Sequence, residues 1–276
     1  MRILVTNDDG IDSVGLHVLA RAMRPFGEVV IAAPDQEYSG FGAALGALHL
    51  MKPDVRRQEV DGIDESWSVS APPALCAMFG RLGVFGTIDL VVSGINPGAN
   101  VGRSVYHSGT VGACLTARNG GISGIAVSQS VDSFGVEGQG WEEALINQNW
   151  QGAADLAAVL VEGFIENPPD EPLVANLNVP NRPAIEMAGW RRTRVGSEPP
   201  RSMSKATLEP KPGHDGTFHV EMTWGDAIQI PTEDDGGAVM AGYASLSWLG
   251  RLEGTDPSAA AVTRSEAALD RFYAAS

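Results

Sequence analysis

Short apolar runs recur along the first 180 residues, and each ends in a polar or glycine-rich segment. A continuous apolar run bounded by turn residues is typical of a strand that is buried on both faces of a parallel sheet. The predicted strands cover residues 3–5, 29–33, 67–70, 88–93, 125–128 and 173–180, with a further extended segment at 47–51. Residues 53–64 are polar, and we expect a turn-rich connection there.

Between these runs the apolar positions recur at the spacing of a helix. Leu16, Leu19 and Met23 share one face, and Asp12 or Ser13 can cap the helix that they form. His17 lies beside this face, and we expect it to pack rather than to bind a ligand. Alternating strands and helices predict an α/β fold with a mostly parallel sheet. Further helices are predicted over 72–83, after Ser108, and from Trp141 to about Ile165.

The pattern changes after Pro180. Residues 181–215 are rich in Arg, Pro and Ser, residues 218–224 and 243–248 alternate like half-exposed antiparallel strands, and a helix is predicted over 257–272. We therefore divide the chain into a domain at 1–180 and an appendage of hairpins and a terminal helix at 181–276. An arm with so little core of its own is expected to pack on a second subunit.

Composition narrows the functional classes. The chain has 276 residues, of which 43% are hydrophobic, and a formal charge of −15 from 34 acidic and 19 basic residues. This balance argues against binding of nucleic-acid polymers, which needs clusters of Lys and Arg. It allows a small anionic substrate, because a metal ion can supply positive charge locally. Cys76 and Cys114 lie in apolar surroundings and are expected in the core. The sequence shows no secretory signal and no apolar run long enough to cross a membrane, so we predict a cytoplasmic protein.

The first predicted strand ends in two adjacent acids, Asp8 and Asp9, followed by Gly10. Ligands of open α/β sheets gather at the carboxyl ends of strands. Two carboxylates at such a place repel each other and are costly to bury without a cation between them. Oxygen ligands of this kind suit Mg²⁺ or Mn²⁺. The alternative is an ordinary strand-to-turn transition, in which Asn, Asp and Gly are common.

Two further strand exits carry side chains that could join such a site. Ser39 lies in the polar loop at 35–42, and Asn96 lies in the glycine-rich segment at 94–102. A hydroxyl and a neutral amide oxygen can both serve a cation, and glycines let the backbone approach a ligand closely. This glycine-rich segment is neither a Walker phosphate loop nor a dinucleotide-binding turn. A plain surface loop is the alternative for residues 35–42.

Ser108, Gly109 and Thr110 open a predicted helix. Free amides and hydroxyls at a helix start form a ready anion site, and they are equally compatible with simple capping. His107 precedes them and is a candidate general acid, or merely the residue that ends the loop.

Several separated motifs occur in the order typical of one family. They cover residues 4–10, 33–40, 91–100 and 108–113, with later landmarks at 177–180 and 234–246. The chain resembles the SurE family of metal-dependent 5′-nucleotidases from residue 1 to about residue 250. The resemblance is specific, because it combines Asn-Asp-Asp-Gly with Ser-Gly-Ile-Asn.

The resemblance implies a Rossmann-like, three-layer domain and hydrolysis of phosphomonoesters, chiefly nucleoside 5′-monophosphates and in some members 3′-monophosphates. It also implies homodimers or homotetramers built through the C-terminal arm. The divalent ion, Mg²⁺ or Mn²⁺ and one per subunit, is expected on four side chains: Asp8, Asp9, Ser39 and Asn96.

The expected mechanism uses the residues around that ion. Asp8 orients or deprotonates the attacking water, and Asn7 supports the two carboxylates from behind. Phosphate oxygens are expected to contact donors that offset their charge. The candidate phosphate-binding residues are Asn96, Asn100, Ser108, Gly109 and Thr110.

Other functions fit less well. A haloacid-dehalogenase-type phosphatase needs a second Asp two positions after the first, where this chain has Gly10. A dinucleotide-dependent oxidoreductase needs the glycine fingerprint that is missing here. Departures from the family pattern at 72–75, 115–118 and 247–248 keep open a phosphatase for a non-nucleotide phosphate. A non-catalytic nucleotide-binding module would bind its ligand without releasing phosphate.

Overall fold

The computed structural model describes residues 1–46, 50, 52–131, 145–198 and 201–274. The predicted extended segment at 47–51 lies outside these residues except at Leu50, and so does the beginning of the helix predicted from Trp141.

A nine-stranded, mostly parallel sheet forms the centre of the molecule, in the order β3-β4-β2-β1-β5-β6-β7-β11-β8. The buried runs predicted a mostly parallel sheet; of the eight neighbouring pairs among the described strands, only β3 against β4 and β11 against β7 are antiparallel. The α/β fold predicted from the sequence is therefore confirmed. The strands are β1 (Arg2–Thr6), β2 (Glu28–Pro34), β3 (Val55–Val60), β4 (Ile63–Val69), β5 (Leu90–Pro97), β6 (Ser123–Gln129), β7 (Val174–Val179), β8 (Trp190–Thr193) and β11 (Ala244–Leu249).

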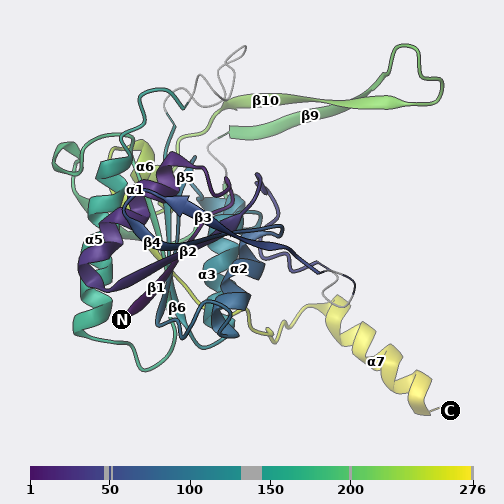
Figure 1. Ribbon diagram of the computed structural model, residues 1–276. Coiled ribbons are helices and arrows are strands. Elements are labelled where there is room, and N and C mark those ends of the chain that lie inside the picture. Colours follow the sequence, from purple (N-terminus) through teal and green to yellow (C-terminus); the bar gives the residue numbers. More distant parts are fainter. Residues whose placement is uncertain (47–49, 51, 132–144, 199–200, 275–276) are drawn as a thin grey trace.

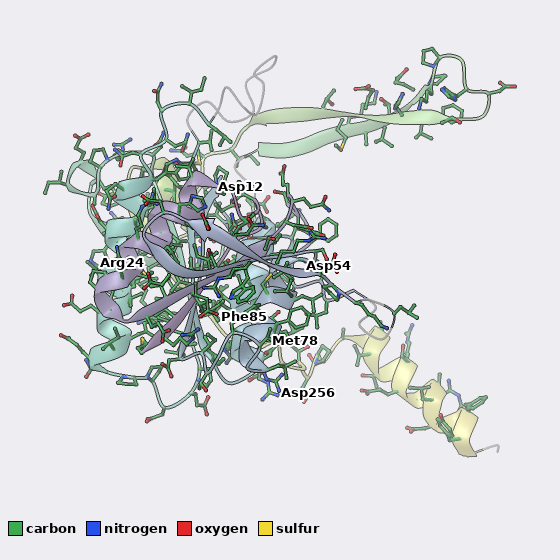
Figure 2. The ribbon with its side chains drawn as sticks, viewed as in Figure 1. Asp12, Arg24, Asp54, Met78, Phe85 and Asp256 are labelled. Carbon is green, nitrogen blue, oxygen red and sulfur yellow. The ribbon has the colours of Figure 1, made fainter. Side chains whose placement is uncertain are left out.

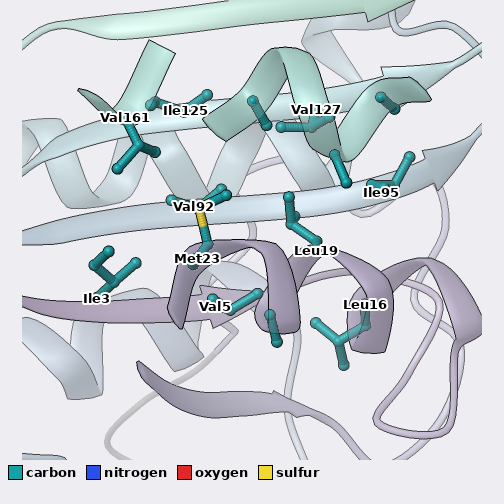
Figure 3. Packing of buried hydrophobic residues seen from close by; sticks show 14 of the residues in the cluster. Ile3, Val5, Leu16, Leu19, Met23, Val92, Ile95, Ile125, Val127 and Val161 are labelled. Atoms are coloured by element: carbon teal, nitrogen blue, oxygen red, sulfur yellow. The ribbon is translucent and has the colours of Figure 1, made fainter. Parts of the chain in front are cut away.

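Helices cover both faces of this sheet (Figure 1). One face packs against α1 (Val14–Met23) and α5 (Trp150–Glu166), and the other packs against α2 (Pro73–Arg81) and α3 (Gly109–Asn119). Leu16, Leu19 and Met23 of α1 are fully buried against β1 and β5, as the helical spacing predicted (Figure 3). Burial of each such side chain contributes about 1.5–3 kcal/mol. The described residues also contain the 3₁₀ helices η1 (Arg24–Phe26), η2 (Gly102–Tyr106) and η3 (Ala184–Glu186) and the short α-helix α6 (Asp235–Met240).

Two predicted elements differ in the structure. The segment predicted to be turn-rich at 53–64 contains β3 and the start of β4, which pair antiparallel at the edge of the sheet. Most side chains of β3 are exposed, so the strand has no apolar pattern to reveal it. Helix α5 begins at Trp150, where Asn149 accepts a hydrogen bond from the amide of Gly152 (3.0 Å) and caps it, so residues 145–149, which were predicted to be helical, lie before it.

The region after residue 180 is only partly an appendage. Strands β8 and β11 belong to the central sheet, where β11 lies between β7 and β8. The hairpin of β9 (Arg201–Pro210) and β10 (Phe218–Ala227) and the terminal helix α7 (Ala260–Ala274) extend away from the body (Figure 1). The division at residue 180 therefore does not follow the sheet, because the last two of its strands come from beyond that point.

No helix in the described part of the chain is long and apolar enough to span a membrane.

Candidate active site

The Asp8–Asp9 pair lies at the carboxyl end of β1, in the middle of the sheet. Thr6 of β1 pairs with Ser93 of β5, so the residues that follow these two strands emerge at the same edge. The chain then turns sharply at Gly10, whose φ of +101° favours glycine, and the Ile11 amide donates to the Pro34 carbonyl at 2.8 Å. This turn brings the loop after β1 against the end of β2.

The N-terminus of α3 holds the Asp8 carboxylate. The Gly109 amide donates to Asp8 Oδ2 at 3.1 Å, and the Thr110 hydroxyl donates to Asp8 Oδ1. A Cβ atom on Gly109 would lie 2.8 Å from both Cβ and Oδ2 of Asp8, so only glycine allows this approach. The positive end of the α3 dipole favours an anion here. Asp8, which is 3% exposed, is therefore fixed by groups more than 100 residues away in the sequence.

The helix start was predicted either to bind an anion such as phosphate or simply to be capped, and in the structure two of its donors bind the Asp8 carboxylate. Ser108 caps α3 by accepting a hydrogen bond from the Val111 amide at 3.1 Å. Its own hydroxyl hydrogen remains able to donate to a ligand. Of the three predicted phosphate-binding residues in this segment, Gly109 and Thr110 thus contact Asp8.

The surroundings of Asp8 and Asp9 raise the pKa values of both carboxyls. Burial raises the pKa of Asp8, and the hydrogen bond from Thr110 opposes that change. The pKa of Asp9 is raised well above its ordinary value by burial, by the negative charge of Asp8 and by that of Glu37. Burial and neighbouring negative charge disfavour the ionised carboxylates, and a bound cation would stabilise them and lower both pKa values.

Asp9 and its neighbour Asn7 each have a buried side-chain oxygen without a hydrogen-bond partner in the described part of the chain. These oxygens are Asp9 Oδ2 and Asn7 Oδ1. The amide nitrogen of Asn7 donates to the Gly10 carbonyl at 3.0 Å, so its oxygen is free to face another group. Buried polar atoms are normally satisfied, and unpaired oxygens on these two neighbouring side chains fit a site for a divalent cation.

The loop that carries Ser39 is bound to the backbone of Asp8. The Tyr38 amide donates to the Asp8 carbonyl at 2.7 Å, which fixes the loop after β2 against the loop after β1. A second bond, from the Gly42 amide to the His107 carbonyl at 2.9 Å, ties the same loop to the segment before α3. The Ser39 side chain is exposed.

Asn96 occupies the end of β5 with its oxygen available. Its amide nitrogen donates to the Gly98 carbonyl at 2.7 Å, and the side chain is half-buried. Just before it, the Gly94–Ile95 peptide is cis, and a Cβ on Gly94 would lie 2.2 Å from the Val127 carbonyl oxygen. Tight packing against β6 therefore fixes the direction in which the chain leaves β5.

Asn100 belongs to a buried polar network rather than to an open surface. Its side-chain nitrogen donates to Ser128 Oγ at 2.9 Å, and its backbone amide donates to Asn178 Oδ1 at 2.7 Å. The Asn100 carbonyl accepts from the side chains of Asn176 (3.0 Å) and Asn178 (3.2 Å). This network sets the position of the loop after β5.

The sequence analysis did not assign a role to Asn176 and Asn178. A signal was present, since two asparagines at alternate positions interrupt an otherwise apolar strand that is buried at every residue. Such residues need buried partners on one face of the sheet, and the loop after β5 provides them.

The two histidines considered in the sequence are placed differently. His17 contacts the Ile11 carbonyl at 2.7 Å and supports the turn after Gly10, as expected of a packing residue. His107 ends η2 with an exposed side chain beside the loop after β2. Its role as a general acid stays a prediction.

The structure thus gathers oxygen-bearing side chains from the exits of three neighbouring strands, β1, β2 and β5, with the start of α3 behind them. Within the described residues, no group of three or more His, Cys, Asp or Glu side chains could hold a metal. A site here must therefore combine the two acids with neutral oxygens, which is a donor set suited to Mg²⁺ or Mn²⁺. That Asp8, Asp9, Ser39 and Asn96 are the ligands stays a prediction.

Comparisons with known proteins show the family to which the chain belongs. The family model described as "Survival protein SurE" matches residues 3–201. Two proteins named 5′-nucleotidase SurE, from the Haemophilus influenzae strains PittGG and KW20 / Rd, are each 33% identical over 252 residues, covering 90% of this chain and 90% of the relative. The crystal structure of SurE protein from Aquifex aeolicus superposes with a TM-score of 0.73 at 28% identity, covering 93% of this chain and 95% of that one. Since both the family model and these relatives extend over most of its length, the chain belongs to the SurE family.

Proposed function

We propose that this protein is a metal-dependent phosphomonoesterase that hydrolyses nucleoside 5′-monophosphates, and also 3′-monophosphates, to nucleoside and phosphate. The observation that carries the proposal is the pair of adjacent acids at the end of β1: Asp8 is buried and held by the start of α3, and half-buried Asp9 has a buried oxygen without a partner among the described residues. The relatives named 5′-nucleotidase support the substrate class.

One divalent ion per subunit, Mg²⁺ or Mn²⁺, would bind at this place. The unsatisfied oxygens of Asn7 and Asp9 and the raised pKa values of Asp8 and Asp9 support a cation there. When bound, such an ion lowers the pKa of a water molecule and offsets charge on the phosphoryl group. The proposed ligands are Asp8, Asp9, Ser39 and Asn96.

The side chains around the ion divide the work of hydrolysis. Asp8 accepts a proton from the attacking water while the oxygen of that water forms the new bond to phosphorus. Gly109 and Thr110 hold Asp8 in the orientation needed for that transfer, and Asn7 supports the carboxylate pair. As the ester bond breaks, His107 gives a proton to the leaving oxygen.

The phosphate oxygens contact donors at the rim of the site. The Ser108 hydroxyl is free to donate, and the Asn96 side chain at the end of β5 and the Asn100 side chain in the loop after it each have a second amide hydrogen besides the one that donates to Gly98 or Ser128. In this proposal Gly109 and Thr110 act through Asp8 rather than on the phosphate. Groups placed in advance where charge shifts during the reaction lower its barrier most effectively.

The hairpin β9–β10 and helix α7 are proposed to form subunit contacts in a homodimer or homotetramer. Both project from the body (Figure 1) and expose large apolar side chains. Exposed apolar area of this kind marks an interaction surface. The exposed residues are Leu208, Phe218, Val220 and Met222 on the hairpin and Leu269, Phe272 and Tyr273 on α7.

Phosphate release from purified protein tests the proposal. Nucleoside 5′- and 3′-monophosphates and small non-nucleotide phosphomonoesters are compared with Mg²⁺, with Mn²⁺ and with a chelator. We expect the fastest release from 5′-monophosphates, and only with metal. Fastest release from a non-nucleotide ester, or nucleotide binding without release, contradicts the proposal.

Variants then connect the activity to the site. Asp8→Asn and Asp9→Asn are expected to abolish release while circular dichroism shows a folded protein. Asp12→Asn is the matched control, because Asp12 lies exposed in the same loop, at the start of α1 (Figure 2). Full activity of either Asp8 or Asp9 variant contradicts the assignment.

A further inference from the structure

A buried carboxylate that is remote from Asp8 and Asp9 in the sequence holds the loop that leads into α3. Asp235 begins α6 and is 1% exposed. The Gly102 amide donates to both of its oxygens, at 3.1 and 3.0 Å, and the Gly196 amide donates to Oδ1 at 3.0 Å. Its own neighbour Gly236 adds a third amide at 2.8 Å. A carboxylate that accepts several amide hydrogens fixes all the segments that donate them.

These donors come from separate parts of the chain. Gly102 begins η2 in the loop after β5, and Gly196 follows β8 at the far edge of the sheet. Gly102 has a φ of +54°, and a Cβ there would lie 3.1 Å from the Glu198 carbonyl oxygen. The loop after β5 is thus fastened to the C-terminal part of the chain at this glycine, which Asp235 binds with both oxygens.

From Gly102, backbone hydrogen bonds lead directly to the catalytic carboxylate. The Ser104 carbonyl, one turn into η2, accepts from the His107 amide at 2.9 Å and from the Ser108 amide at 3.0 Å. Ser108 caps α3, and the next residue, Gly109, donates its amide to Asp8. A displacement of Gly102 would therefore move the start of α3 and the groups that hold Asp8.

We propose that Asp235 is a positioning residue for the reaction: it fixes Gly102, and through η2 it keeps the start of α3 on Asp8. The inference rests on the proposed function, because it assigns Asp235 a role in that same site. Asp235 itself contacts neither the proposed metal ligands nor the predicted phosphate-binding side chains. Its effect is expected on the rate of the chemical step rather than on the affinity for substrate.

The neighbouring residue supplies a matched control. Asp234 pairs with Arg194, whose side chain is 73% exposed. The same change of Asp to Asn at two successive positions of one helix start therefore separates the Gly102 contact from a general effect on α6. Asn at 235 would place an amide nitrogen against the Gly102 amide, donor against donor.

The experiment compares wild type, Asp235→Asn, Asp235→Glu and Asp234→Asn with Mn²⁺ and a nucleoside 5′-monophosphate, below the melting temperature of each. A misplacement of about 1 Å costs on the order of 10²-fold in rate. We expect Asp235→Asn to lower kcat by this factor with little change in KM, and Asp234→Asn to match wild type. Asp235→Glu, which keeps both acceptor oxygens, is expected to lie between.

Hydrogen exchange provides a readout that does not depend on activity. Amides of residues 98–108 are expected to exchange faster in Asp235→Asn than in wild type or Asp234→Asn. If wild type releases no phosphate, the proposed function fails while the exchange result still tests the Asp235 contact. The inference is overturned by unchanged exchange in 98–108, by wild-type kcat in Asp235→Asn, or by an equal loss in Asp234→Asn.

Discussion

Gly109→Ala is the sharpest single perturbation of the proposed site. The added methyl carbon would lie 2.8 Å from both Cβ and Oδ2 of Asp8. This is about 0.6 Å short of the 3.4 Å at which ordinary contacts begin, so Asp8 or the start of α3 must move. Either movement lengthens the bond from the Gly109 amide to the carboxylate, which is 3.1 Å in the structure.

The cost can be worked from that bond. A hydrogen bond to a charged group contributes about 1.5–3 kcal/mol. Lost from the transition state, this corresponds to a rate lower by about 10- to 150-fold, at roughly 1.4 kcal/mol per factor of ten. We therefore expect kcat/KM for a nucleoside 5′-monophosphate to fall within that range in Gly109→Ala.

Gly163→Ala controls for the substitution itself. Gly163 lies exposed in α5, and a Cβ there would meet open space. Replacing an exposed helical glycine by alanine stabilises a protein by about 0.8–1 kcal/mol, so this variant should melt higher and keep full activity.

The assay is phosphate release per folded protein, with folding verified by circular dichroism at the assay temperature. If Gly109→Ala keeps kcat/KM within a factor of about two of wild type, a difference well below one hydrogen bond to a charged group, then the contact between α3 and Asp8 does not matter for the reaction. That result would refute the geometry on which the proposed mechanism depends.

Four further outcomes are expected. The pKa of Asp9 is raised above its ordinary value. In the metal-free folded protein Asp9 therefore keeps its proton at pH values above about 4, at which the same group is ionised in the unfolded chain. Its contribution to the free energy of unfolding falls as the pH rises from about 4 to the raised pKa. Asp9→Asn flattens this slope in thermal melts with chelator, and equal slopes in the two proteins contradict the assignment. Mn²⁺ at about 100 times its Kd stabilises wild type by about 2.7 kcal/mol, raising Tm by roughly 5 °C or more, and this shift is absent in Asp9→Asn. Thr110→Val removes the hydroxyl that donates to Asp8 and lowers kcat by about tenfold or more, while Thr110→Ser, which keeps the hydroxyl, recovers most of the rate. Deleting residues 251–276 removes α7 and reduces the oligomer measured by light scattering; an unchanged molar mass shows that α7 does not hold subunits together.

The central fold could be predicted because its strands are buried on both faces. Apolar runs such as 29–33 and 125–128 have no solvated side, so their composition alone reveals them. Strand β3 could not be found in this way. Its side chains, among them Arg56 and Arg57, are exposed, and only the pairing with β4 keeps the segment extended.

The acidic end of β1 was equally visible, since two adjacent carboxylates after a buried strand demand an explanation. The sequence did not reveal which anion binds the start of α3. The sequence shows donors at Ser108, Gly109 and Thr110, which suit a phosphate and a carboxylate equally well. The choice of Asp8 depends on how β1 and α3 lie in space, and no local pattern records that.

Asp235 illustrates the limit most clearly. Its partners are backbone amides, which every residue other than proline carries, and Gly102 lies 133 residues away in the sequence. No side-chain motif announces such a contact. Asn178 is an intermediate case: its place in a buried apolar strand signals that it needs a partner, but the partner, the backbone of Asn100, becomes visible only when β7 and the loop after β5 are seen together.

The most direct test of the account is the position of the metal. A crystal of the protein soaked in Mn²⁺ is measured at a wavelength at which manganese scatters anomalously. The account predicts one strong peak per subunit, within coordination distance of the Asp8 and Asp9 carboxylates, the Ser39 hydroxyl and the Asn96 amide oxygen. A manganese peak bound elsewhere, or no peak at this edge of the sheet at a concentration that supports full activity, would contradict it.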